Sequence, residues 1–216
     1  MFLKRFVLPT VYLFVLAVSS DLIAQDKPES ARNSIGLRAG YTSPAGDWHR
    51  SPVAPSVDLI GGNLAFEGDL DFAIGRLWTL GVEGSYSSLN GSAWEGYVSG
   101  KGGSVSVSGS FLRFALLVRP HIKLGRSYCI RLEFGPALLL ASGQETFAGR
   151  TYPYDFLQET SFGAQAGIEY IRALDETLAL SVKACVLYFP SSVEFAGGAA
   201  GSMVFVPITA GIRFLL

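Results

Sequence analysis

Two histidines, His49 and His121, are the candidates for a general base in an enzyme that acts on lipids. His49 stands beside Trp48 and Arg50 in a segment expected to be a long loop, and His121 stands in an expected short turn. Neither is followed by the serine-containing pattern that such an enzyme requires, and a nucleophile needs its base within hydrogen-bond reach. We therefore expect both to be solvated loop histidines and predict no catalytic residue.

An acidic row, Glu67, Asp69 and Asp71, could hold a hard cation such as Ca²⁺. Arginine and lysine side chains on facing segments are simpler partners, so we expect no metal ion here. The glycine-rich stretches 100–103 and 197–198 lack the following Lys-Ser/Thr of a phosphate-binding loop, and we expect no cofactor.

The acidic row belongs to a segment with a period of two, because each acidic or small residue alternates with an apolar one. Successive side chains of a strand point to opposite faces, so this segment predicts a strand with one apolar and one acidic face. The apolar face comprises Leu64, Phe66, Leu70, Phe72 and Ile74. The same alternation predicts eight strands, at residues 34–42, 62–74, 77–88, 104–119, 127–142, 159–172, 177–189 and 202–216.

The composition favours a membrane protein, since the chain is 49% hydrophobic, 16% charged and has a mean hydropathy of +0.34. The longest apolar run is Phe6 to Val18, and a spanning helix needs about 17 to 25 residues. A closed β-barrel is the other structure that pairs every backbone group within a bilayer. A formal net charge of -1 gives no electrostatic basis for binding nucleic acid.

Residues 1–24 have the features of an export signal, with Lys4 and Arg5 before the apolar core and small residues at its end. We predict cleavage after Ala24, a periplasmic lead-in at residues 25–33 and a barrel at residues 34–216. An uncleaved anchor helix is the alternative.

The expected connections alternate in length, and this sets the topology. Connections after odd strands are long: residues 43–61, 89–103, 143–159 and 190–201. Connections after even strands are short: residues 75–76, 120–126 and 173–176. Outer-membrane barrels have long extracellular loops and short periplasmic turns. The pattern predicts an up-and-down, eight-stranded antiparallel transmembrane β-barrel with both termini in the periplasm. A soluble β-sandwich is the alternative, but it would not need apolar alternation on all strands.

Charged residues of both signs occupy the inward-facing positions of these strands. The interior of an eight-stranded barrel is about wide enough for side chains to fill it. These residues are therefore interpreted as a network of salt bridges that plugs the lumen, and the alternative is a narrow polar pore. The set is Arg38, Glu67, Asp69, Asp71, Glu83, Arg113, Arg131, Glu133, Glu169, Lys183 and Arg213.

Two cysteines and two prolines test the strand assignment. Cys129 and Cys185 fall on strands that are not neighbours, so we interpret them as small interior fillers, with a disulfide as the alternative. Pro136 and Pro207 lie inside predicted strands, where a closed barrel has no free edge. We expect a bulge or local irregularity at each.

The segment Gly40 to Trp48, with its Pro-Ala-Gly-Asp-Trp loop start, resembles the outer-membrane β-barrel domain proteins of Gram-negative bacteria. The final strand, Ile208 to Phe214, is similar to the signal recognised by the barrel-assembly machinery, although Leu215 and Leu216 follow its aromatic residue. The cleavage region resembles that of such proteins in the Bacteroidetes. The resemblance implies a small OmpA/OmpX-like barrel in the outer membrane, with lipids and the assembly machinery as partners. It implies no particular activity or surface ligand.

Overall fold

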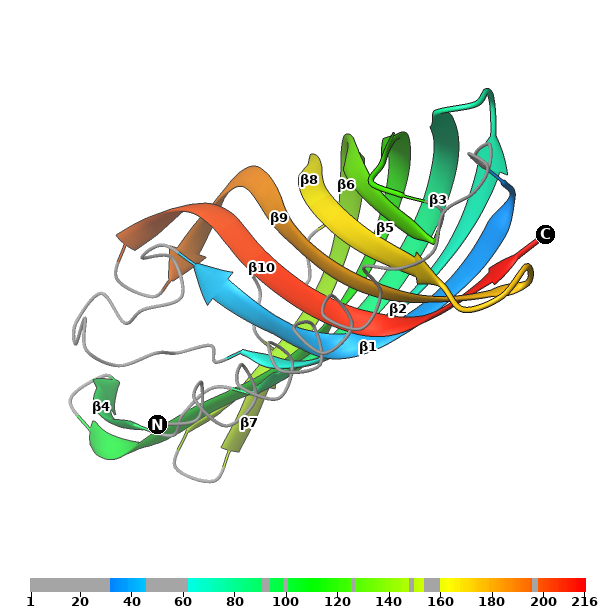
Figure 1. Ribbon diagram of the computed structural model, residues 1–216. Helices are drawn as coiled ribbons and strands as arrows, with labels where there is room; N and C mark the ends of the chain where they lie inside the picture. The colour runs from blue at the N-terminus through cyan, green and yellow to red at the C-terminus, as the bar shows by residue number, and fades with distance from the viewer. Residues whose placement is uncertain are drawn as a thin grey trace.

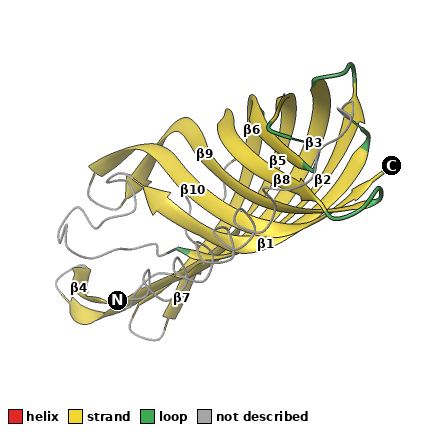
Figure 2. Ribbon diagram, in the orientation of Figure 1, coloured by secondary structure: helices red, strands yellow, loops and turns green. Residues whose placement is uncertain are grey.

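The computed structural model describes residues 32–45, 62–90, 94–98, 101–125, 127–147, 150–153, 160–195 and 198–216. The expected export signal, most of the expected lead-in and His49 lie outside these residues. Every element among the described residues is a β-strand (Figure 2). No helix in this part of the chain is long and apolar enough to cross a membrane.

Eight long antiparallel strands close into a barrel (Figure 1). The ring closes because β1 pairs with β10 and β5 pairs with β6. In order around the barrel, these strands are β1 (Ser34–Ala45), β2 (Asn63–Ala73), β3 (Trp78–Asn90), β5 (Lys101–Lys123), β6 (Tyr128–Phe147), β8 (Thr160–Ala173), β9 (Leu178–Phe195) and β10 (Gly198–Leu215). The fold class predicted from the sequence is confirmed.

The period of two places apolar side chains outside and polar ones inside. Large apolar residues are exposed along every barrel strand, as at Leu116 (61% exposed) and Phe162 (73%). The residues between them are mostly buried. A belt of exposed apolar side chains around a closed barrel is the surface that a lipid bilayer covers.

The two ends of the barrel differ. At one end, which we call the turn end, the strands are joined by residues 74–77, 124–127 and 174–177. The other end, which we call the loop end, carries the remaining connections. The second turn is shorter than expected, because β5 continues to Lys123 and pairs His121 with Arg131 and Ile122 with Ile130. Pro120 and His121 therefore lie in β5 and not in a turn.

At the loop end, strands replace parts of the expected loops. The hairpin of β5 and β6 is paired out to Val105–Phe147, and two short strands flank it: β4 (Trp94–Val98) pairs with β5, and β7 (Arg150–Pro153) pairs with β6. Figure 1 shows this sheet, in the order β4-β5-β6-β7, extending past the end of β1. The expected loop at residues 190–201 is largely strand, because β9 and β10 are paired as far as Phe195–Gly198.

Neither Pro136 nor Pro207 lies at a bulge. Between β9 and β10, Leu187 pairs with Phe205, and the next pair is Ala184 with Ile208. Two residues are skipped on each strand, Val206 and Pro207 among them, so the register is unchanged and no extra residue is inserted. Pro136 is skipped in the same way beside β5 and is paired with Ala164 of β8. At these two prolines the predicted irregularity is a gap in the ladder, as expected where proline lacks an N–H donor. The register shifts elsewhere, on both sides of Ser202, and Pro190 and Ser191 of β9 are skipped between the pairs Ser202–Ser192 and Met203–Phe189.

Candidate functional site

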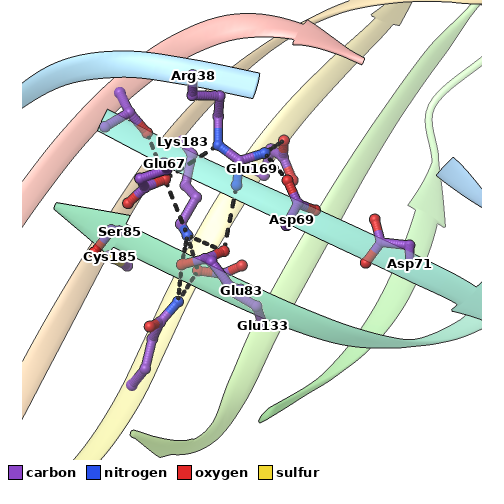
Figure 3. A network of polar contacts seen from close by, with 12 residues as sticks. Arg38, Glu67, Asp69, Asp71, Glu83, Ser85, Glu133, Glu169, Lys183 and Cys185 are labelled. Carbon is purple, nitrogen blue, oxygen red and sulfur yellow. Dashed lines mark hydrogen bonds and ion pairs between the residues drawn. The ribbon is translucent and has the colours of Figure 1, made fainter. Parts of the chain in front are cut away.

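The candidate site is the interior of the barrel. Every charged residue that the sequence analysis placed there is at most 4% exposed, and each of the eight barrel strands contributes at least one. Figure 3 shows Arg38 and Lys183 directed toward the carboxylates of Glu67, Glu83 and Glu169, which come from three different strands. The alternation of the strands positions them, because each occupies an inward position and its neighbours along the strand, most of them apolar, face outward.

Lys183 on β9 lies at the centre of this network. Its Nζ is 2.6 Å from both carboxylate oxygens of Glu83 on β3, the strand on the opposite wall. It is also 3.0 Å from Glu133 Oε1 and 3.4 Å from Glu67 Oε2. One ammonium group therefore joins carboxylates from three strands.

Arg38 on β1 contacts two of these carboxylates, Glu67 and Glu83, and also Asp69 of β2 and Glu169 of β8. Its Nε donates to Glu67 Oε2 at 3.1 Å, and its Nη1 lies 2.9 Å from both Asp69 Oδ1 and Glu169 Oε1. Its Nη2 is 3.3 Å from Glu83 Oε2. Contacts of this kind satisfy the several donors of a guanidinium group in its buried position.

Arg119 belongs to the network, although the sequence analysis did not include it. It is 0% exposed, and it contacts Asp71, Asp69 Oδ2 at 2.9 Å, Glu83 Oε2 at 2.5 Å and Glu133 Oε2 at 3.3 Å. With Arg119, the buried network among the described residues has six cationic and six anionic side chains, so its formal charge is zero. The expected set carried one excess negative charge, and Arg119 balances it.

Arg131 and Arg213 complete the network toward the turn end. Both contact Asp71 and Glu169, and Arg213 Nη2 is 2.8 Å from Asp69 Oδ2. Asp71 thus accepts from three arginines, Arg119 included. The partners of the acidic row are therefore arginine side chains of β1, β5, β6 and β10 and the lysine of β9.

Neutral polar residues extend the network, and sequence reasoning missed them. Gln165 Nε2 donates to Glu133 at 2.7 Å and to Glu83 at 3.1 Å, and its Oε1 accepts from Arg113 at 2.7 Å. Arg113 also lies 2.7 Å from Glu83 and 3.0 Å from Glu67. Gln165 has the inward parity of Glu169 on β8, and this parity is the signal that could have found it.

An apolar layer fills the interior on the loop-end side of the network. Phe205 packs edge-on against Phe111, with ring centroids 4.8 Å apart, and against Phe189 at 6.3 Å. These rings are 0–4% exposed, and they lie nearer the loop end along their strands than Arg113, Lys183 and Arg213 do. The barrel therefore contains a charged layer and a separate apolar layer.

His121 of β5 lies between Thr79 of β3 and Cys129 of β6. His121 Nε2 lies 3.1 Å from Thr79 Oγ1, and Nδ1 lies 3.6 Å from Cys129 Sγ. Cys129 and Cys185 are both free thiols, so the disulfide alternative is wrong. Cys185 is buried, and Cys129 is partly exposed. Within the described residues, no group of three or more potential ligands is placed to hold a metal ion.

Comparisons with known proteins bear on the fold. No family model matches the chain, and no curated protein matches it in sequence. Among solved structures, it is similar to a major outer membrane protein from Thermus thermophilus, with a TM-score of 0.50 and 16% identity, over 86% of this chain and 100% of that one. It is also similar to OprG from Pseudomonas aeruginosa, with a TM-score of 0.49 and 11% identity over 89% and 99% of the two chains.

A third similar structure is Neisserial surface protein A, with a TM-score of 0.48 and 10% identity over 87% of this chain and 99% of that one. The closed antiparallel barrel and its exposed apolar belt define the class of protein: a small eight-stranded outer-membrane β-barrel.

Proposed function

We propose that this protein is a closed, non-enzymatic barrel of the outer membrane, with a structural or surface-binding role. The charge-balanced network in its lumen is the observation that carries the proposal. A conducting pore needs a continuous aqueous path, whereas here every charged side chain of the network contacts an opposite charge within it and an apolar layer lies beside it. Buried charges that lose a partner are costly, so the network also disfavours rearrangement.

The sheet β4-β5-β6-β7 supports the surface-binding part of the proposal. It extends beyond the barrel at the loop end, and binding residues are concentrated on projecting segments held by a rigid scaffold. The short turns at the opposite end favour an orientation with the turn end in the periplasm and the loop end outside the cell. In this orientation the barrel anchors the sheet on the cell surface.

Export and assembly follow the scheme inferred from the sequence. The signal at residues 1–24 is cleaved after Ala24, residues 25–33 form a periplasmic lead-in, and residues 34–216 enter the outer membrane through the barrel-assembly machinery. The exposed apolar belt contacts the outer-membrane lipids. N-terminal sequencing of the purified protein tests the cleavage site, and a first residue of Gln25 is expected.

Tag accessibility tests the orientation. Epitope tags are inserted after residue 98, between β4 and β5, after residue 148, between β6 and β7, and after Asp175 in a short turn. On intact cells, we expect protease to remove the first two tags and to spare the third until the outer membrane is permeabilised. Cleavage of the Asp175 tag on intact cells, with protection of the other two, would reverse the orientation and refute surface display of the sheet.

Lipid modification is the enzymatic alternative, and its candidate base is His49. Cells that express the wild-type protein, cells that express His49→Ala and cells without the protein are compared by mass spectrometry of lipid A and phospholipids. We expect the three profiles to agree. A modification that appears only with the wild-type protein would overturn the non-enzymatic assignment.

A further inference from the structure

A thiol and an imidazole share the wall of a small cavity at the turn end of the lumen. Cys129 is on β6 and His121 on β5, and the imidazole Nδ1 is 3.6 Å from the thiol Sγ. The same thiol is 3.5 Å from the carbonyl oxygen of Ile130, so either acceptor can take its S–H. Both side chains line the cavity, which has a volume of about 90 Å³, and Cys129 is partly exposed. A small molecule in the cavity would therefore lie beside the thiol and its neighbouring imidazole.

Thr79 contacts the other nitrogen of the imidazole. Its Oγ1 is 3.1 Å from His121 Nε2, and Thr79 on β3 is 0% exposed, so this contact is shielded from water. When the ring carries its proton on Nε2 and donates it to Thr79, the lone pair of Nδ1 is free to accept the thiol proton. A nucleophile beside a base that a third group orients is the arrangement that activates the nucleophile.

The surroundings of Cys129 make this base necessary. Partial burial opposes an ionised thiol, because a thiolate is stabilised poorly away from water. Lys123 is directly opposite Cys129 in the register of β5 and β6, and its positive charge acts in the other direction. A partly buried thiol loses its proton most readily to a base in contact with it, and His121 is placed to be that base.

We propose that Cys129 undergoes thiol–disulfide exchange with small disulfides, with His121 as the general base. The thiol proton passes to His121 Nδ1 while Cys129 Sγ attacks one sulfur of the disulfide. The S–S bond of the small disulfide breaks as a new S–S bond to Cys129 forms, and the departing thiolate takes the proton from His121. The products are a mixed disulfide on Cys129 and one free small thiol, so the disulfide itself is the only oxidant.

The position of the cavity suggests where the disulfide comes from and what its attachment changes. In the orientation proposed above, the turn end faces the periplasm, an oxidising compartment in which disulfides persist. This source rests on the proposed function, whereas the exchange itself is measured on purified protein and does not depend on orientation. The attached group would lie beside Arg131 and Arg213, which line the same cavity and belong to the charge network.

Cys185 is the internal control for the exchange. It is 3% exposed on β9, and its Sγ is 3.9 Å from Arg113 Nη1. The reduced mature protein in a maltoside detergent is treated at one fixed pH with bis(2-hydroxyethyl) disulfide, a neutral reagent. Mass spectrometry of the intact protein and of its peptides gives the rate at each cysteine, and heat-modifiable mobility first shows that each variant is folded. We expect Cys129 to gain one hydroxyethylthio group about tenfold or more faster than Cys185.

Variants of each cysteine assign the modified position. Cys129→Ser should abolish the fast modification, and Cys185→Ser should leave its rate unchanged. Modification of Cys185 as fast as that of Cys129, or fast modification that persists in Cys129→Ser, would overturn the proposal.

Variants of His121 separate a base from a merely structural residue. A general base contributes roughly 10² to 10⁴ in rate, so we expect His121→Ala and His121→Gln to slow the exchange by about tenfold or more. Added imidazole should raise the rate of His121→Ala, because it can act as the base in the space left by the side chain. An unchanged rate in both variants, or a slow rate in His121→Ala that imidazole does not raise, would show that His121 is not the base.

Thr79 is a positioning residue in this proposal, because it acts through the imidazole. We expect Thr79→Val to slow the exchange and Thr79→Ser, which keeps the hydroxyl group, to retain most of the wild-type rate. Equal rates in Thr79→Val and the wild type would remove Thr79 from the proposal.

Discussion

Lys183 on β9 and Glu83 on β3 meet across the full width of the barrel, with the lysine Nζ 2.6 Å from each carboxylate oxygen. These two strands lie opposite each other in the ring, with three strands between them on either side. The contact therefore links two walls that share no backbone hydrogen bond. Lys183, Glu83 and the arginines around them fill the central section of the lumen with paired charges.

A double-mutant cycle measures this link. Lys183→Met leaves the buried Glu83 with one cation fewer, and loss of one partner from a buried pair costs about 3 to 5 kcal/mol. We expect Lys183→Met and Glu83→Gln each to lower the free energy of unfolding, measured by urea titration in lipid vesicles. Because the side chains are in contact, we expect the double variant to depart from additivity by about 1 to 3 kcal/mol.

Lys123→Met combined with Glu83→Gln is the matched control, since Lys123 lies at the turn end of β5 and outside the network. That pair should be additive within about 0.5 kcal/mol. Equal coupling in the two pairs would show that the cycle reports a general charge effect and not the contact across the lumen.

Strand parity explains why most of the network could be predicted from the sequence. Glu67, Asp69 and Asp71 alternate with apolar residues, so their common face was visible without a structure. Arg119 was missed because strand 104–119 was taken to end there, before Pro120. The pairs Trp78–Pro120 and His121–Arg131 continue β5, and they give Arg119 the inward position two residues beyond Leu117.

Other features depend on long-range packing that alternation does not reveal. Phe111, Phe189 and Phe205 have the inward parity of the charged residues, but their contact arises from three different strands. The strands β4 and β7 lie in segments that were expected to be long loops, and at 94–98 and 150–153 they are too short to cross a bilayer. Pairing with the extended hairpin of β5 and β6 gives them strand structure.

A charge on the outer face tests the lipid-facing belt. Leu116 is 61% exposed near the middle of β5, and arginine at a barrel midplane costs about 2 to 4 kcal/mol. We expect Leu116→Arg to lower the free energy of unfolding by this amount in vesicles. Leu124→Arg is the control, because Leu124 is 59% exposed but lies in a short turn. Equal effects in the two variants would place Leu116 outside the bilayer.

Gly211 on β10 tests the close approach of two strands at the barrel closure. A Cβ atom there would collide with the carbonyl oxygen of Leu37 and lie 2.7 Å from Arg38 Cα, both backbone atoms of β1. We expect Gly211→Ala to lower the free energy of unfolding by about 1 to 3 kcal/mol, because the backbone of a closed barrel cannot move aside cheaply. Urea titration measures the change.

Gly68→Ala is the matched control for this prediction, since the nearest atom to its added Cβ is Leu37 Cδ2 at 3.7 Å. We expect little loss of stability from Gly68→Ala. If Gly211→Ala were as mild, the strands at the closure would be farther apart than the structure shows.

Asp175 provides a pH-dependent element outside the bilayer. Its carboxylate accepts from the Thr177 N–H at 2.7 Å, the Thr177 hydroxyl at 2.8 Å and the Leu178 N–H at 2.8 Å, which lowers its pKa below the ordinary value of 3.8. A lowered pKa in the folded state means that the turn is stabilised above pH 3.8, and that this contribution is lost as the pH falls through the folded-state pKa.

An NMR titration of the Asp175 side-chain carbonyl carbon measures this pKa in the folded barrel. We expect a midpoint below 3.8 in the wild type. Thr177→Ala removes the hydroxyl donor and should raise the midpoint toward that value. A midpoint at or above 3.8 in the wild type would show that these hydrogen bonds do not favour the ionised carboxylate.

Single-channel recording in planar bilayers tests most directly whether the lumen is closed. Heat-modifiable mobility on a gel first shows that the wild-type protein, Glu67→Gln and Arg131→Gln are folded in the vesicles used for fusion. The balanced charge network and the apolar layer beside it predict no steady conductance from the wild type. Steady single-channel conductance that changes in Glu67→Gln or Arg131→Gln would contradict the account, because ions would then pass through the network.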